Sequence, residues 1–332
     1  MQLRPPVPLG SHGSSVAARG VERPPAGHYG GVPIDLRGTL REAGRSYPGR
    51  DLSLWAAGAT FFGIIGSVPL AMLSLRLAAA LVGPEVILAD VEALLAGVSS
   101  AHGTPTAVRT LTGTALALSW LQTAALLLPA GLYGEGLRRA FLQMSPQEAN
   151  VLTGWRGRLG VLPAAAVTPF LVAALLASAP TVAPLYAAGG DRLVLGVVIG
   201  FHVLWVLVSV TTLLAFALVA PDRVGLRALL VGAFGTGAVL AGFLLGFVLF
   251  LAIPLDWSLP FGGLPVVGAL AALGLWLYLL HVLLLLGYRL TLVLDTNATR
   301  ANGTATAPIT RPPTTAEPGS PKNTACATTE DA

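Results

Sequence analysis

The stretch LVLGVVIGFHVLWVLVSVTTLLAFALV, at residues 193–219, contains no Asp, Glu, Lys or Arg. A helix needs roughly 20 apolar residues to cross a bilayer, because the hydrocarbon core is about 30 Å thick and a helix rises about 1.5 Å per residue. These 27 residues are long enough for one crossing. They predict a transmembrane helix and place the chain among integral membrane proteins.

Five further stretches of similar length and composition lie on either side of this one. They cover residues 54–75, 111–132, 159–183, 226–253 and 264–286. In the whole chain 54% of residues are hydrophobic, 11% are charged and the mean hydropathy is +0.73, values typical of membrane proteins. We predict an all-α polytopic membrane protein, whose six-helix transmembrane bundle with kinked helices occupies residues 35–295.

Basic residues are distributed unevenly over the segments between the predicted spans. Of the 20 Lys and Arg residues, 17 lie in the N-terminal segment, in the loops after the second and fourth spans, and in the C-terminal segment. Only Arg76, Arg109 and Arg192 lie on the opposite side. Because Lys and Arg are retained on the cytoplasmic side of a membrane, both termini are predicted to be cytoplasmic, as an even number of spans also requires.

Two short interfacial helices are predicted outside the spans. In residues 35–47, Arg37, Arg41 and Arg45 repeat beside apolar residues at helical spacing, which is typical of a helix on an anionic inner leaflet; the alternative is a disordered basic leader. A segment that begins at Pro84 is predicted to lie on the outer surface, because its apolar residues share one face. They are Ile87, Leu88, Val91, Leu94 and Leu95.

Residues 1–34 and 296–332 are predicted to be disordered. The first segment is rich in Pro, Gly and Arg and lacks the apolar core of a signal peptide, and the second is dominated by Thr, Ala, Pro and Asn. Neither segment can bury enough apolar surface to offset its ordering entropy. The single cysteine, Cys326, lies in the second segment, so no disulfide can form within the chain.

Polar side chains inside the predicted membrane region are functional candidates, because a charged group costs at least about 2.5 kcal/mol at the centre of a span. The candidates for a polar path are His202, His281, Gln122, Ser119 and Arg76. The alternative for each histidine is a neutral imidazole hydrogen-bonded to a neighbouring helix, and the alternative for Arg76 is an anchor that reaches the headgroups. Gln122 and Ser119 could equally join helices by hydrogen bonds.

Prolines and small residues indicate how the spans bend and pack. Pro69 lies in the first span, and Pro163 and Pro169 lie in the third; each removes a backbone hydrogen bond and predicts a kink. Kinked spans often border cavities in transporters, and simple bending is the alternative. Small residues at i, i+4 and i+8 of the fifth span predict close helix packing. They are Ala238, Gly242 and Gly246.

The sequence contains no complete catalytic or metal-binding motif. Its five histidines are far apart and never occur with another His or Cys at ligand spacing, and no Gly-rich phosphate loop carries a Lys. The scattered arginines fit membrane topology better than a nucleic-acid surface. We therefore predict no enzyme activity, cofactor, metal or nucleic-acid partner. The predicted partners are a bilayer with an anionic inner leaflet and a lipid-like substrate, and the sequence leaves the oligomeric state open.

Several segments between about residue 36 and residue 294 resemble the YihY/BrkB family of bacterial six-span inner-membrane proteins, once labelled ribonuclease BN. In the first span, AAGATFF at 56–62 and VPL at 68–70 are similar to the family's opening motif and mid-span proline. GLRRAF at 136–141 and WRGRL at 155–159 resemble its basic loop. Pro221 with RALLVGA at 227–233, and WLY at 276–278 with LG at 286–287, resemble its fifth and sixth spans.

The resemblance implies a bacterial plasma-membrane protein linked to envelope integrity, and movement of a lipid or amphiphile is suggested for some members. A non-transporting scaffold or structural protein is the alternative. A membrane-associated ribonuclease has the least support, because a nuclease needs positioned acids, bases or metals. The chain departs from the family where Tyr288 and Arg289 replace a small residue and Glu after Gly287, and where Phe261 replaces Tyr, so no role of that Glu is carried over.

Overall fold

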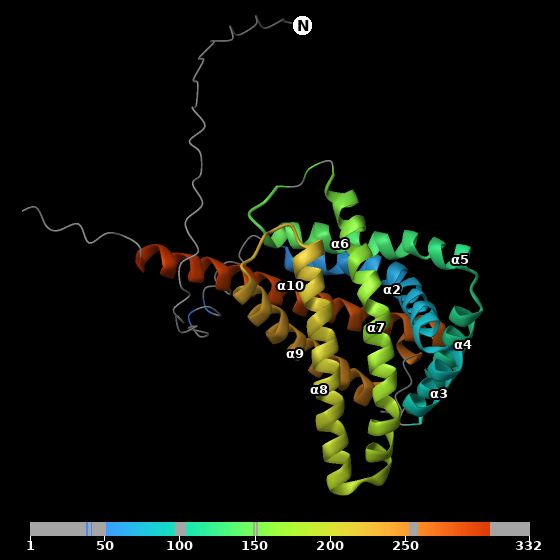
Figure 1. The fold of residues 1–332 in the computed structure, drawn as a ribbon. Coiled ribbons are helices and arrows are strands. Elements are labelled where there is room, and N and C mark those ends of the chain that lie inside the picture. The colour runs from blue at the N-terminus through green and yellow to red at the C-terminus, as the bar shows by residue number, and fades with distance from the viewer. Residues whose placement is uncertain are drawn as a thin grey trace, which may run out of the picture. The chain divides into compact units, whose positions relative to one another are not determined.

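The computed structural model describes residues 38, 41, 51–96, 104–148, 150, 152–251 and 258–305, and all regular secondary structure in these ranges is helical (Figure 1). The elements are α2 (Leu52–Val82), α3 (Pro84–Leu95), α4 (Thr104–Ala117), α5 (Trp120–Ala125), α6 (Leu127–Met144), α7 (Thr153–Ala188), α8 (Gly190–Leu214), the π-helical turn η1 (Ala215–Val219), α9 (Leu226–Leu251), the 3₁₀ turn η2 (Leu259–Phe261) and α10 (Pro265–Ala305). The predicted all-α class is confirmed.

Five of the predicted spans correspond to long apolar helices. These are α2, α7, α8 with η1, α9 and α10, each long and apolar enough to cross a membrane. The predicted second span, 111–132, is instead divided between α4 and the α5–α6 segment, which meet at 114°. The described residues therefore contain five candidate spans, or six if this bent pair makes one crossing.

The break in the second span begins at Ser119. Its backbone is extended (φ −68°, ψ 160°), and its Oγ accepts a hydrogen bond from the backbone N of Gln122. The Gln122 side chain in turn accepts a hydrogen bond from the backbone N of Ser119 at 2.9 Å. This reciprocal capping box satisfies donors at the start of α5, so a new helix begins where hydropathy alone predicts continuation.

The predicted outer segment from Pro84 is a helix, α3. Ile87, Val91 and Leu95 are buried against residues of α2, α4 and α7, while Leu88 and Leu94 remain exposed. Arg109 donates two hydrogen bonds to the carboxylate of Glu92, at 2.7 and 2.8 Å, which joins α4 to α3. These bonds hold the pKa of Glu92 below its ordinary value.

The C-terminal tail starts later than predicted, because α10 continues to Ala305 rather than ending near residue 295. The hydroxyls of Thr296 and Thr299 donate to the carbonyls of Leu292 and Asp295, one turn earlier. Extending a nucleated helix costs much less than starting one, so the helix passes beyond its apolar part. The predicted helix at 35–47 and segment 1–34 lie outside the described residues, apart from residues 38 and 41.

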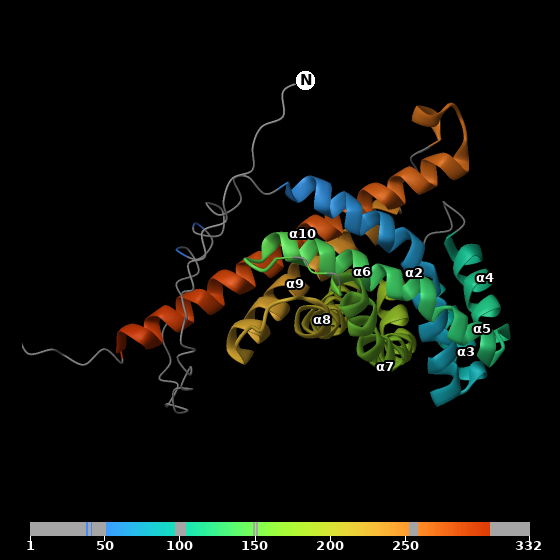
Figure 2. The same ribbon diagram turned by 90° about the horizontal axis from the view of Figure 1, so that it is seen from above.

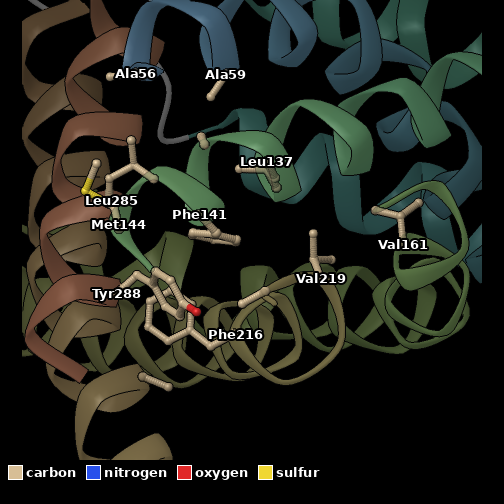
Figure 3. Packing of buried hydrophobic residues seen from close by; sticks show 13 residues of the cluster. Ala56, Ala59, Leu137, Phe141, Met144, Val161, Phe216, Val219, Leu285 and Tyr288 are labelled. Atoms are coloured by element: carbon tan, nitrogen blue, oxygen red, sulfur yellow. The ribbon is translucent and has the colours of Figure 1, made fainter. Parts of the chain in front are cut away.

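Neighbouring helices in the sequence pack against one another, and α10 returns to lie against α2 and α9. The α7–α8 pair forms an antiparallel hairpin, which Figure 2 shows nearly end-on. Its turn uses Gly189 and Gly190 at φ 68° and 56°, a region that side chains disfavour. The main core lies where α2, α6, α7, η1, α9 and α10 meet. There the ring centroids of Phe141 and Tyr288 lie 4.6 Å apart, and both side chains are drawn in Figure 3.

Glycines allow the closest helix approaches, but not at the positions that the small-residue ridge predicts. A Cβ on Gly157 of α7 would lie 2.6 Å from the carbonyl oxygen of Gly134, where α6 crosses α7 steeply (Figure 1). On α9, a Cβ on Gly237 would lie 2.7 Å from Ser209 Cα. A Cβ on Gly242 would reach only Phe201, at 4.0 Å, and one on Gly246 would meet no described atom within 4 Å. Gly242 and Gly246 of the ridge thus make no comparably tight contact with the described residues, because spacing defines a face but not its neighbour.

The prolines are accommodated inside long helices. Pro69 lies within α2, and Pro163 and Pro169 lie within α7, which also contains Pro180 and Pro184. The kinks at these positions stay a prediction.

Candidate functional site

A partly open cavity of about 280 Å³ lies among α2, α6, α7, α8, η1, α9 and α10. Most of its wall is apolar, with Leu, Val and Ala side chains from all of these elements. The polar side chains on the wall are Tyr133, Thr168, Thr211, Thr212 and His281. A mainly apolar wall with a few polar groups is typical of sites that bind small amphiphilic or apolar molecules.

His281 is the centre of a buried hydrogen-bond network at this cavity. Its Nδ1 donates to the carbonyl oxygen of Leu277 at 2.7 Å, because a carbonyl can only accept. In a neutral imidazole, Nε2 then accepts from the hydroxyl of Tyr133, 3.1 Å away. The hydroxyl of Thr60 lies 3.2 Å from Nδ1 and donates to the carbonyl of Ala56. The imidazole of His281 therefore links α2, α6 and α10.

Two glycines of α2 make room for this network. A Cβ on Gly63 would lie 3.0 Å from Cε1 of His281, and a Cβ on Gly66 would lie 2.7 Å from Cβ of Tyr133. Larger residues at these positions would push the imidazole or the phenol away from α2. The approach of α2 and the position of the His281–Tyr133 pair are therefore linked.

The structure does not bring His202 to the cavity. Its side chain is exposed, and Nδ1 donates to the carbonyl of Val198 in its own helix at 2.7 Å. Its ring meets the edges of its helix neighbours Phe201 and Trp205. Of the two histidines that the sequence singles out, only His281 lines the cavity.

Arg76, Ser119 and Gln122 come together at a different place, the break between α4 and α5. Arg76 donates from Nε to the carbonyl of Leu118 at 3.1 Å, and its guanidinium lies 4.5 Å from the ring centroid of Trp120. Ser119 and Gln122 form the capping box of α5. The five polar candidates thus occupy three separate locations, and the three at the break stabilise its local geometry.

A second polar cluster, which sequence reasoning missed, surrounds Asp222 between η1 and α9. Its Oδ2 accepts from the hydroxyl of Tyr288 at 2.6 Å, and its Oδ1 accepts from the hydroxyl of Ser145 at 2.9 Å and the side chain of Gln147 at 3.2 Å. Sequence reasoning also missed Tyr133 of the cavity. It follows directly after the predicted second span, where hydropathy indicates only a loop.

Among the described residues, no group of three or more His, Cys, Asp and Glu side chains could hold a metal ion.

Comparison with known proteins identifies the family of the chain. No curated protein and no solved structure matches it. A family model described as Virulence factor BrkB matches residues 43–310, which is most of the 332-residue chain and covers the cavity and the Asp222 cluster. The chain therefore belongs to the BrkB family of membrane proteins.

Proposed function

We propose that this protein is a non-enzymatic, multi-pass plasma-membrane protein of the bacterial envelope that moves a lipid-like amphiphile across or within the membrane. The observation that supports this function is the partly open, mainly apolar cavity of about 280 Å³ with His281 and Tyr133 on its wall. The apolar wall suits an acyl chain, since removing apolar surface from water or headgroups is favourable.

The His281–Tyr133 hydrogen bond gives the cavity a place where a polar group could exchange partners. It joins α10 to α6 across the cavity wall at 3.1 Å. A buried bond of this kind contributes only about 1 kcal/mol net, so a passing amphiphile that offers its own donor or acceptor could replace it at little cost. The network would then hold the helices together and still allow movement.

The proposed topology has both termini in the cytoplasm, with the bent α4–α6 segment making one crossing. The uneven distribution of Lys and Arg supports this orientation. The six crossings that result agree with the upper count for the described helices.

The function is tested by filling the cavity. Ala164 lines it, whereas Ala166 is exposed on the same helix and does not line it. Full-length wild type, Ala164→Phe and Ala166→Phe are reconstituted into liposomes that carry labelled phospholipids. Ala164→Phe is expected to reduce lipid movement to the rate of protein-free liposomes, and Ala166→Phe to keep the wild-type rate. A folded Ala164→Phe variant with wild-type movement would count against the proposal.

A non-transporting membrane scaffold is the second candidate function. One observation favours it: the polar groups selected from the sequence make separate helix contacts instead of one continuous path. A scaffold would complement an envelope defect equally well with the cavity open or filled. Complementation by Ala164→Phe in cells, together with an inactive wild type in liposomes, would therefore support the scaffold.

A further inference from the structure

Four arginines gather near the crossing of α6 and α7, and one carboxylate serves two of them. Glu135 accepts from Arg139 at 2.8 Å and from Arg158 at 2.8 Å. The remaining two, Arg138 and Arg156, have no ion pair among the described residues. The cluster thus carries more positive charge than Glu135 can balance.

Arg138 is directed toward η1. Its Nη1 donates to the carbonyls of Val219 and Ala220 at 2.7 and 3.3 Å, and its Nε is buried without a hydrogen-bond partner in the described part of the chain. Carbonyl acceptors do not neutralise a guanidinium. The carboxylate of Asp222 interacts favourably with Arg138 and offsets part of the charge, whereas the charge of Arg156 opposes that of Arg138. The four arginines therefore face two carboxylates, those of Glu135 and Asp222.

This positive charge adjoins the part of the cavity wall formed by Leu137, Val161 and Val219. Leu137, directly before Arg138, lines the cavity, and so does Val219, whose carbonyl Arg138 contacts. Val161, one turn after Arg158, lines it as well. Figure 3 shows these three side chains on α6, η1 and α7. From Val219 the cavity follows α8 back to Val208, a distance of about 16 Å along the helix.

We propose that Arg138 and Arg156 bind the phosphate headgroup of the amphiphile whose chain occupies the cavity, an inference that rests on the proposed function. Guanidinium groups recognise phosphate oxygens by charge-assisted, often bidentate hydrogen bonds. A headgroup beside this part of the wall would supply an acceptor for the buried Nε and neutralise the excess charge, while its chain extends along the apolar wall toward His281. The substrate class is therefore an anionic phospholipid.

Binding of defined probes to the full-length protein in detergent tests this assignment. The probes are dioctanoyl phosphatidylglycerol, dioctanoylglycerol with the same chains but no phosphate, and inorganic phosphate. Wild type is expected to bind the phospholipid at least about tenfold more tightly than dioctanoylglycerol, since hydrogen bonds to charged groups are the strong class. The Arg138→Gln/Arg156→Gln variant should lose this preference and keep its affinity for dioctanoylglycerol.

Two further variants serve as controls. Arg192→Gln removes an exposed arginine at the start of α8, at the opposite end of α7 from Arg156, and should retain the preference. Arg138→Lys keeps the charge and should retain most of the preference for the phospholipid. Arg156→Gln alone changes an exposed position and should weaken this preference, so the test stays decisive if Arg138→Gln fails to fold.

Three outcomes overturn the inference. They are equal affinity for the two lipids, a preference that survives in the double variant, and inorganic phosphate that binds as tightly as the phospholipid, which would indicate a free-phosphate site. These failures are distinct from failure of the proposed function. If the headgroup site is wrong but the cavity is right, Ala164→Phe still abolishes lipid movement and dioctanoylglycerol binding.

Discussion

The hydroxyl of Tyr288 donates a 2.6 Å hydrogen bond to Oδ2 of Asp222 and so joins α10 to the segment between η1 and α9. The ring of Tyr288 is fully buried against Phe141 and Phe216. Because Asp222 also accepts from Ser145, one carboxylate holds three segments that are distant in the sequence.

Tyr288→Phe is expected to destabilise the protein by about 1–3 kcal/mol, because it keeps the packing and leaves a carboxylate oxygen without its donor. Thermal unfolding in detergent measures the change. Tyr278→Phe is the matched control, since the Tyr278 hydroxyl makes no hydrogen bond within the described residues and its ring lies beside the same core. Equal losses in the two variants would show that the bond to Asp222 adds no stability.

Gly237→Ala and Gly246→Ala compare two glycines of α9. A Cβ at Gly237 would lie 2.7 Å from the backbone of Ser209, so we expect about 1–3 kcal/mol of destabilisation. A Cβ at Gly246 would meet no described atom within 4 Å. Because Ala has the higher helix propensity, Gly246→Ala should leave the stability of the protein unchanged or raise it by up to about 1 kcal/mol. Unfolding in detergent gives the ranking, and the reverse order would indicate that the Gly246 face is the helix contact.

His281→Leu and His202→Leu separate the two histidines. Loss of His281 leaves the Tyr133 hydroxyl unpaired beside the cavity, and we expect reduced lipid movement in liposomes together with about 1–3 kcal/mol of destabilisation. His202→Leu should change neither, because its side chain is exposed and bonded only within its own helix. Adding Tyr133→Phe to His281→Leu should recover stability but not lipid movement. Equal effects of the two histidine variants would contradict a special role for the cavity.

Arg76→Met tests the break between α4 and α5. It removes the bond to the carbonyl of Leu118 and the stacking on Trp120, so the segment 118–123 should exchange its amide hydrogens faster. Arg192→Met, at an exposed position, should leave this exchange unchanged. Unaltered exchange in Arg76→Met would mean that the capping box of Ser119 holds the bend by itself.

Cys326 provides a direct test of the orientation, because it is the single cysteine of the chain. A membrane-impermeant maleimide should label it in cells only after permeabilisation if the C-terminus is cytoplasmic. A Ser11→Cys/Cys326→Ser variant should behave in the same way for the N-terminus. Labelling of only one of the two sites in intact cells would imply an odd number of crossings, and the bent α4–α6 segment would then fail to cross.

Much of the fold could be predicted because apolar runs leave the backbone few alternatives in lipid, where only internally bonded structures are stable. This holds for α2, α7, α8, α9 and α10, and the helix from Pro84 was predicted from its spacing. The break at Ser119 was not predicted, since an average over apolar residues hides a single capping side chain. The end of α10 was placed too early for a similar reason, because composition does not report how far a helix propagates.

The candidate site could be predicted only in part. His281 was identified because an imidazole inside a span is unusual, but its partners Thr60 and Tyr133 lie 221 and 148 positions away in the sequence. His202 carried the same signal but does not line the cavity. Likewise the ridge at Gly242 and Gly246 was visible as a pattern, while the actual contacts at Gly157 and Gly237 depend on which helices meet.

Hydropathy and charge are properties of short segments, and they sufficed to predict a helical membrane protein with several apolar spans. The meeting of Tyr133 with His281, of Tyr288 with Asp222, and of Arg138 with Val219 is a property of helix packing. Such contacts depend on steric fit between surfaces distant in sequence, because in lipid the association of helices is driven by close packing and interhelical hydrogen bonds rather than by hydrophobicity. The cavity and the positive charge beside it therefore emerge only when the helices are assembled.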